Sequence, residues 1–467
     1  MYMVHSKYKN LLKDTLLFAL GSIGSKLILF VMMPIYTNYL TQSEYGISEL
    51  VFSVSQLLIP FISLVIFDAV VRFGLSKERC AEDVLLIGLL VFGAGSVLTI
   101  LITPLIGLYD TLAEWKWYLC AYIIANILVS IEYSYLKATD QNKLYAVVNI
   151  LQTLILAVLN VVLLVFVKMG VQGYLISMIA ASAGAAAVVF LAGKLPAALK
   201  KARFRRDLLG QMLAFSAPLI LNNVSWWAIH SSDKVMLELM IGSAALGVYT
   251  VATKIPSLIN VIISIFSQAW NISAVKEVEG SNDTSFYSDV FYVYQFVVFG
   301  ACIGIVSVVK PFMSIYVGEE FRDAWRYIPL LLLGASMSAI ASYFGSLYAA
   351  MKKSVNNMLT TLSAALVNIA VNYVMIPKIG IMGAVMGTVA AYLMLAGVRL
   401  FDVRKFIEIK IDWFVFGMNF TVAAVQAVMV TRDIRGLLIS ALAIVVFLIC
   451  NLKGAGRFLK KRQRFNM

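Results

Sequence analysis

Successive apolar windows, each about 20 residues long and separated by short polar loops, dominate this sequence. A window of that length crosses a hydrocarbon core of roughly 30 Å as a helix. Since hydrocarbon offers the backbone no hydrogen-bond partner, a long continuous window indicates a helix and not an open strand. With 61% hydrophobic residues, 13% charged residues and a mean hydropathy of +0.88, the chain has more apolar residues than a soluble core needs. We predict an all-α polytopic membrane protein.

The windows divide into fourteen predicted transmembrane helices. The first contains a lysine and lacks a small-residue cleavage site, so we expect it to be retained as a helix. The loops between the windows are too short to hold a folded domain. The predicted ranges are Leu11–Tyr36, Gly46–Val71, Val84–Leu108, Trp115–Leu136, Leu144–Val167, Val171–Ala192, Leu213–Asp233, Ala244–Ala269, Phe286–Val309, Trp325–Ala350, Met358–Pro377, Gly383–Leu400, Trp413–Val430 and Leu437–Leu452.

Basic residues are unequally divided between the two sides of the membrane. Of the 38 Lys and Arg residues, 27 fall in the N-terminal segment and the even-numbered loops, nine fall in the odd-numbered loops, and Lys26 and Lys254 lie deep within spans. Basic residues close to the end of a span are counted with the adjoining segment; these are Lys13, Lys116, Arg326 and Arg399. Because loops rich in Lys and Arg stay in the cytoplasm, both termini are predicted to be cytoplasmic. Because membrane orientation explains the basic loops, the net charge of +13 does not indicate nucleic-acid binding.

Two stretches recur and predict a duplicated chain. Gly170-Val-Gln-Gly is matched 210 residues later by Gly380-Ile-Met-Gly, and the segment before Gly46 resembles the segment before Gly247 at an offset of 201. An even number of spans in each repeat makes the repeats parallel, with a pseudo-two-fold axis along the membrane normal. The predicted domains are an N-lobe over 1–193, a basic cytoplasmic linker over 194–210, a C-lobe over 211–405, and two extra helices with a basic tail over 406–467.

Two lysines lie deep within predicted spans. Lys26 is in the first span, and Lys254 shares one face of the eighth span with Thr250, Ser257 and Gln268. Burying a lysine in hydrocarbon costs roughly 2.5 to 3.5 kcal/mol, so such a residue normally faces a partner or a watery cavity. We therefore predict that both lysines face a central cavity.

Four further charged or polar residues near the ends of spans are candidates for the same cavity. Each has a structural alternative: Arg72 pairs with Asp68 near the inner surface, His230 is an ordinary interhelical polar residue, and Asp233 and Lys234 form the outer end of a helix. The predicted substrate-binding set is Lys26, Arg72, His230, Asp233, Lys234 and Lys254.

Sequence signatures of catalysis are lacking. There is no HExxH, no P-loop and no Gly-rich dinucleotide turn, and the four cysteines form no metal-binding or disulfide pattern. We predict a transporter and not an enzyme, with no cofactor and no bound metal. Coupling to a Na⁺ or H⁺ gradient is left open.

The segments around the lobe starts resemble a known family. Asp233-Lys-Val-Met-Leu, Leu246-Gly-Val-Tyr and Ala252-Thr-Lys-Ile in the second half, with Asn38-Tyr-Leu-Thr-Gln-Ser-Glu-Tyr-Gly and Val71-Arg-Phe in the first, are similar to polysaccharide repeat-unit flippases. These belong to the multidrug/oligosaccharidyl-lipid/polysaccharide (MOP) exporter superfamily, which has a MATE-like fold. The resemblance covers nearly the whole chain in span number and lobe division.

The resemblance implies an alternating-access flippase in the bacterial plasma membrane. Its substrate would be an undecaprenyl-diphosphate-linked oligosaccharide, with Lys26 and Lys254 binding the pyrophosphate and Arg72 as an entry contact. The implied surroundings are membrane lipids, with polysaccharide polymerase and glycosyltransferases as candidate partners of a monomeric protein and no nucleic acid. The alternatives left open are a MATE-type drug or cation antiporter, a lipid II flippase of the same fold, and a membrane enzyme of envelope polysaccharide assembly.

Overall fold

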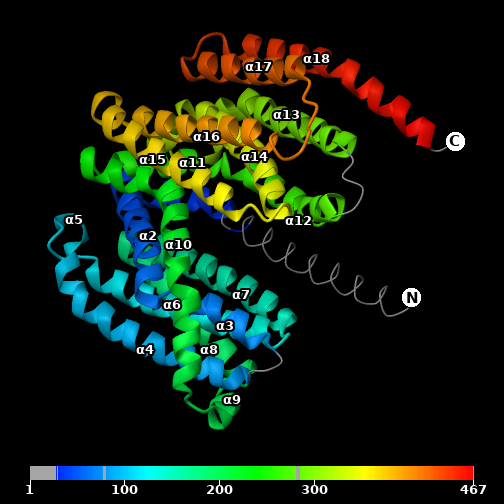
Figure 1. Ribbon diagram of the computed structural model, residues 1–467. Coiled ribbons are helices and arrows are strands. Elements are labelled where there is room, and N and C mark those ends of the chain that lie inside the picture. The colour runs from blue at the N-terminus through cyan, green and yellow to red at the C-terminus, as the bar shows by residue number, and fades with distance from the viewer. Residues whose placement is uncertain (1–27, 29, 77–79, 280–283, 466–467) are drawn as a thin grey trace. The chain divides into compact units, whose positions relative to one another are not determined.

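Every regular element in the described part of the chain is a helix (Figure 1). The computed structural model describes residues 28, 30–76, 80–279 and 284–465. Among these residues, eleven helices are long and apolar enough to cross a membrane, and Gly436–Leu452 is a shorter apolar helix. The predicted all-α polytopic fold is confirmed. The first predicted span lies largely outside the described residues.

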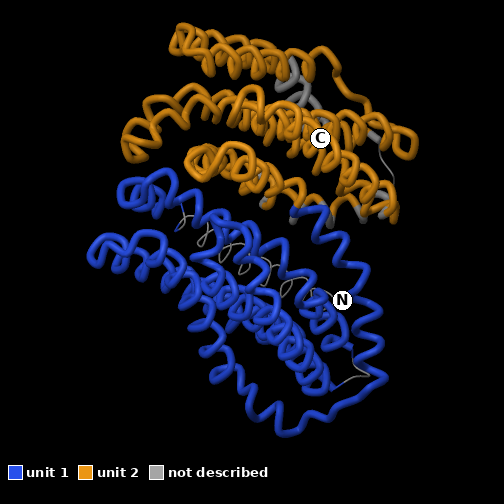
Figure 2. Tube along the Cα trace, turned by 90° about the vertical axis from the view of Figure 1, so that its left-hand side faces the viewer, with its two compact units in different colours: residues 1–227 blue, residues 228–467 orange. Residues whose placement is uncertain are grey.

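The chain forms two compact units, residues 1–227 and 228–467, shown in different colours in Figure 2. The boundary between them falls within α10 (Arg206–Met240). The predicted linker over 194–210 contains α9 (Leu195–Lys201) and the start of α10, and the Asp83 carboxylate accepts a 2.7 Å hydrogen bond from the Arg203 amide there. The division into two compact units does not test the predicted lobe boundaries, so these boundaries remain predictions.

Unit 1 is a bundle around one buried helix, α6 (Lys116–Ala138). Helix α6 packs against the helices before and after it in the chain because its apolar side chains, such as Leu119, Ile123 and Ile131, are buried around most of its circumference. The other elements of the unit are residues 30–39, α2 (Gln42–Ser63), α3 (Ile66–Gly74), α4 (Ala81–Ile106), α5 (Asp110–Ala113), α7 (Asn142–Asn160) with its π-helical continuation η1 (Val161–Phe166), and α8 (Gly170–Ala192).

Unit 2 has the same arrangement around α14 (Ile328–Ala350), whose most apolar window is 83% buried. Helix α14 packs against α12, α13, α15, α16 and α17. The elements of this unit are the end of α10, α11 (Ser243–Lys254), α12 (Ser257–Glu279), α13 (Thr284–Tyr316), the 3₁₀ helix η2 (Glu319–Arg326), α15 (Ser354–Ile379), α16 (Ile381–Val403), α17 (Trp413–Thr431) and α18 (Gly436–Phe465).

The predicted internal repeat is visible in the order of elements and in matching turns. Helices α2 and α11 begin 201 residues apart, and Gly170 and Gly380, 210 residues apart, have φ of +57° and +61°. Glycine adopts a positive φ at no steric cost because it has no Cβ, which explains its recurrence. A third match escaped sequence analysis: Asp140 and Lys352 have φ of +59° and +60°, and the next amide donates to the carbonyl five residues back at 2.8 Å in both turns.

Two predicted spans are each broken into two helices. The predicted helix Gly46–Val71 is α2 and α3, and the predicted helix Ala244–Ala269 is α11 and α12. In both, a proline without an amide donor (Pro60, Pro256) precedes a serine that competes for backbone carbonyls: Ser63 Oγ donates to Ile59 O at 2.7 Å and Ser257 Oγ to Lys254 O at 2.5 Å. Apolar periodicity does not reveal such breaks.

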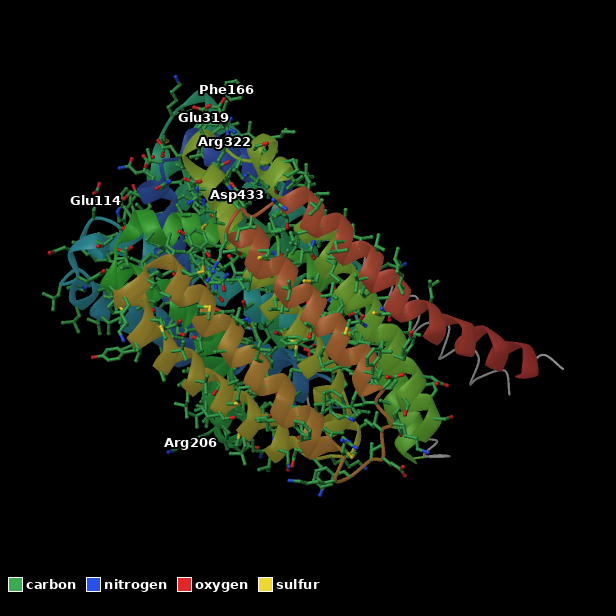
Figure 3. The ribbon with its side chains drawn as sticks, turned by 90° about the horizontal axis from the view of Figure 1, so that it is seen from above. Glu114, Phe166, Arg206, Glu319, Arg322 and Asp433 are labelled. Atoms are coloured by element: carbon green, nitrogen blue, oxygen red, sulfur yellow. The ribbon has the colours of Figure 1, made fainter. Side chains whose placement is uncertain are left out.

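Residues predicted to lie on one side of the membrane gather at one end of each unit (Figure 3). In unit 1, Glu114 and Phe166 lie at one end and Arg206 lies toward the other. In unit 2, Glu319, Arg322 and Asp433 lie near one another. There, Lys310 forms a 2.5 Å ion pair with Asp433 and places its ammonium 4.8 Å from the Trp325 ring centre, which joins α13 to the α17–α18 turn and to η2.

A buried arginine ties three helices of unit 2 together. Arg399 of α16 was assigned to a loop by charge counting, but its side chain is only 4% exposed. Its guanidinium donates to the Ala341 carbonyl of α14 at 3.0 Å and, on α15, to Asn357 Oδ1 at 2.6 Å and to Thr360 and Thr361 hydroxyls at 3.1 and 2.8 Å. Neutral acceptors therefore satisfy this charge inside the bundle.

Candidate functional site

A buried carboxylate lies at the centre of the polar residues of unit 2. Asp233 of α10 is 4% exposed and accepts hydrogen bonds from Tyr249 of α11 and, at 3.3 Å, from Thr388 of α16. The Tyr249 and Thr388 hydroxyls are themselves 3.2 Å apart. The predicted alternative for Asp233, a helix end in the headgroup region, does not fit this burial, because the carboxylate joins three helices. We call Asp233, Tyr249 and Thr388 the Asp233 cluster.

Amide side chains extend the polar region along α10. Ser232, next to Asp233, donates a 3.0 Å hydrogen bond to Asn368 Oδ1 of α15, and Asn372 Nδ2 donates to the same oxygen at 2.9 Å. Asn368 Nδ2 and Asn372 Oδ1 are buried and have no hydrogen-bond partner among the described residues. Buried amides without partners are costly in a packed interior, so these two atoms are candidates for contact with a polar ligand.

The remaining α10 candidates lie on the same face of the helix as each other. His230 and Lys234 are four residues apart, with His230 exposed and Lys234 half-buried. His230 Nδ1 is 3.3 Å from the Tyr392 hydroxyl of α16. The structure therefore brings His230 and Asp233 to α16 through different partners, one turn of α10 apart.

Lys254 ends α11 at the break before α12 and is half-buried. Thr250, one turn earlier on the same face, is fully buried, and its hydroxyl has no hydrogen-bond partner among the described residues. The expected continuous polar line from Thr250 to Gln268 is interrupted, because the helix ends at Lys254 and the next begins at Ser257. At the break, Ser257 Oγ donates to the backbone carbonyl of Lys254 itself.

The other two members of the predicted set are in the first half of the chain. Arg72 is exposed in the last turn of α3, one helical turn after Asp68, which is also exposed. Lys26 lies outside the described residues, so its place in the cavity stays a prediction.

Unit 1 has a tyrosine cluster of its own. Tyr36, Tyr45 and Tyr174 pack with ring centres 5.2 to 6.3 Å apart, and Asn160 Nδ2 donates to the Tyr36 hydroxyl at 3.2 Å. Glu49 of α2 is 3% exposed. A polar and aromatic interior of this kind resembles a binding region more than a lipid-facing surface.

Trp227 has a structural role in unit 1. Its indole N–H donates a 2.8 Å hydrogen bond to the Ser53 carbonyl of α2. Trp226 is 46% exposed, as is typical of tryptophans that anchor a helix at the membrane interface.

Tyr249, Thr388, Tyr392, Asn368 and Asn372 were not predicted as site residues. The only sequence signal for them is the Asn368 and Asn372 pair, which places two amides on one face of an apolar helix at a spacing of four. The tyrosines and the threonine are ordinary residues in such helices. They are recognised as site residues only because α10, α11 and α16 contact one another. Within the described residues, no three His, Cys, Asp or Glu side chains gather as a metal site.

The sequence matches the family described as polysaccharide biosynthesis protein over residues 11–270, more than half of the chain. The chain belongs to this family. The match runs through unit 1 and α10 to α11 and most of α12, and thus includes Asp233, Tyr249 and Lys254. Among curated proteins, none matches the sequence significantly.

Solved structures show which fold this family member has. The lipid II flippase MurJ in an inward closed conformation is similar with a TM-score of 0.72 at 14% identity, over 95% of this chain and 100% of MurJ. An inward-facing MATE multidrug resistance transporter of the MOP superfamily has a TM-score of 0.63 at 13% identity, over 81% of this chain and 97% of its own. A MOP superfamily transporter from Pyrococcus furiosus has a TM-score of 0.57 at 14% identity, over 84% and 95%.

These likenesses confirm the predicted MATE-like fold. At identities this low they establish the fold alone. Family, fold and apolar helices together make the chain a multi-pass membrane protein of polysaccharide biosynthesis.

Proposed function

We propose that this protein is an alternating-access flippase that moves an undecaprenyl-diphosphate-linked oligosaccharide, the repeat unit of a polysaccharide, from the cytoplasmic to the outer leaflet. The observation that carries the proposal is Lys254, a half-buried cation at a helix break in a transporter-like fold of a polysaccharide biosynthesis family. A pyrophosphate headgroup must cross the hydrocarbon, and a cation within about 4 Å contributes up to roughly 4 kcal/mol at an effective dielectric constant near 20.

Roles follow for the other cations. Lys26 and Lys254 bind the pyrophosphate, and exposed Arg72 contacts the lipid on the cytoplasmic side. The breaks at α2–α3 and α11–α12 supply the hinges that alternating access needs, because few backbone hydrogen bonds must change there. The protein acts in the bacterial plasma membrane as a monomer, without an enzymatic cofactor, and delivers its product to polymerase and glycosyltransferases of the same process.

The experiment that tests this function uses proteoliposomes. Purified protein is reconstituted with a fluorescent undecaprenyl-diphosphate oligosaccharide, and its appearance in the opposite leaflet is followed. The flippase predicts movement of this lipid and no efflux of organic cations. Cation efflux without lipid movement would instead identify a drug or cation antiporter. The observation that favours this alternative is Glu49, a buried acid of unit 1 that could bind a cation. Preferred movement of lipid II over other lipid-linked glycans would identify a lipid II flippase.

The Asp233 cluster is where we place the coupling ion. A carboxylate that accepts hydrogen bonds from the hydroxyls of Tyr249 and Thr388 offers oxygen ligands to Na⁺ or an acceptor for H⁺. The neighbouring residue, Ser232, bonds to an α15 amide. Binding there would change the contacts between α10, α11 and α16, which are the helices that must move.

Replacing Asp233 with asparagine is expected to make translocation independent of the ion gradient. The amide keeps the size of the side chain but neither ionises nor attracts a cation. In proteoliposomes with an imposed Na⁺ or H⁺ gradient, the wild type should accelerate several-fold over the gradient-free rate, and Asp233→Asn should not. Glu238→Gln is the matched control, since Glu238 is also a buried acid of α10 and accepts a local 3.0 Å hydrogen bond from Ser243. An unchanged gradient response in Asp233→Asn would rule out this coupling site.

Cys80 provides a test of orientation. It is exposed just before α4, in a loop predicted to be cytoplasmic, and its thiol donates to the Glu82 carboxylate at 3.1 Å. This hydrogen bond, which stabilises the protonated thiol, is the largest cause of the raised pKa of Cys80. Because the thiolate is the reactive form, maleimide labelling should require a higher pH than in Glu82→Gln.

The labelling is measured on inverted and right-side-out vesicles with a membrane-impermeant maleimide. We expect labelling in inverted vesicles only, with a rate near neutral pH that rises a few-fold in Glu82→Gln. A Cys80→Ser variant shows the background from the remaining cysteines. Labelling in right-side-out vesicles would reverse the predicted topology.

A further inference from the structure

An open apolar groove of about 620 Å³ runs along unit 1 between α4, α6 and α8. Small side chains form it: Ala125 on α6 and Ala183 and Ala187 on α8 leave a channel that Leu128 and Phe190 border. Neither the Asp233 cluster nor the predicted cation set includes any of these residues.

One charged residue lines this groove. Glu132 of α6 is 1% exposed, and its Oε2 atom is buried without a hydrogen-bond partner among the described residues. Everything else that lines the groove is Ala, Leu, Ile or Phe. A buried carboxyl oxygen in apolar surroundings is strongly unfavourable unless a donor reaches it, so the groove is incomplete as it stands.

The internal repeat shows that packing does not require this glutamate. The matching turns at Asp140 and Lys352 are 212 residues apart, which places Phe344 of α14 at the position of Glu132. Phe344 is fully buried against Phe291 of α13, and α17 packs over α13 and α14. In unit 2 protein side chains therefore fill the equivalent face, whereas in unit 1 alanines leave it open around a carboxylate.

The dimensions and charge of the groove define its occupant. From Ala121 to Glu132 the α6 lining rises by eleven residue steps, or about 16 Å, close to one leaflet of a hydrocarbon core of roughly 30 Å. Glu132 lies six residues before Ala138, the end of α6 that is predicted to be cytoplasmic. Tyr133 and Lys137 of the same turns are polar anchors typical of the interface.

We propose that this groove holds one hydrocarbon chain of an inner-leaflet phospholipid with an ammonium headgroup, such as phosphatidylethanolamine, and that the headgroup donates to Glu132. Small residues allow the chain to lie close to the helices, and the carboxylate selects an amine over an anionic headgroup. The lipid fills in unit 1 the place that Phe344 and its neighbours fill in unit 2.

Native mass spectrometry tests the proposal on the full chain, released from nanodiscs with equal amounts of phosphatidylethanolamine, phosphatidylglycerol and polyprenyl phosphate. The wild type should retain one phosphatidylethanolamine with at least a fivefold preference over phosphatidylglycerol. Ala187→Phe, which fills the groove, should lose this lipid, and Glu132→Gln should reduce the preference to near unity. Val158→Phe, on an exposed face of α7, is the matched control and should behave as the wild type.

Three results would overturn the proposal. These are equal retention of phosphatidylglycerol by the wild type, retention of polyprenyl phosphate in place of phosphatidylethanolamine, and a retained lipid that survives Ala187→Phe. A dimer mass that disappears in Ala187→Phe would show a second copy of the chain on this face, and would equally exclude the lipid. Translocation activity does not enter the readout, so the outcome is independent of the proposed function.

Discussion

Replacing Lys254 with alanine is expected to reduce translocation of the lipid-linked oligosaccharide in proteoliposomes at least tenfold. The ammonium at the end of α11 would no longer offset the charge of the pyrophosphate inside the membrane, a contribution of up to roughly 4 kcal/mol at about 4 Å. Arginine carries the same charge, so Lys254→Arg should retain a large part of the rate. The measurement is the initial rate of leaflet exchange at equal reconstituted protein.

The controls for this prediction separate a binding role from a general effect of charge. Lys378→Ala removes an exposed lysine of α15 and should leave the rate unchanged. The double variant of Lys26→Ala and Lys254→Ala should be slower than either single variant if both lysines contact the same pyrophosphate. Full transport by the double variant would refute the assignment of both residues.

The second large effect is expected on stability. Arg399→Met should lower the free energy of unfolding by about 3 kcal/mol, because Asn357, Thr360, Thr361 and the Ala341 carbonyl would lose their donor in a buried place. Thermal unfolding in detergent measures this as a fall in Tm of several degrees. Arg399→Lys should restore only part of the lost stability. A single ammonium lacks the forked geometry with which the guanidinium reaches acceptors on two helices.

Arg404→Met is the matched control for Arg399. Arg404 is exposed one turn later in the chain, with its guanidinium 5.5 Å from the Trp413 ring centre, and its loss should change Tm little. An Arg399→Met variant as stable as Arg404→Met would show that the buried hydrogen bonds contribute nothing to holding α14, α15 and α16 together.

For the charged residues of the interior, the sequence indicated the residue but not its surroundings. Asp233 was recognisable in the sequence as a charged residue near a span, but a helix end explained it equally well. Its burial and its contacts with Tyr249 and Thr388 come from α11 and α16, which lie 16 and 155 residues further along the chain. Arg399 was assigned to the wrong environment, because charge counting assigns a basic residue near the end of a span to the adjoining loop.

Hydrophobicity along the chain determined the all-α membrane fold, since the cost of an unpaired backbone in hydrocarbon leaves a long apolar segment no alternative to a helix. The glycine turns at Gly170 and Gly380 likewise revealed the duplication, because a positive φ is a local property that glycine adopts at the lowest cost. Which polar side chains meet in the interior depended on contacts between distant segments. The Asp233 cluster, the Arg399 network and the groove at Glu132 exist only once the helices pack, because a side chain's burial and partners are set by its neighbours in space.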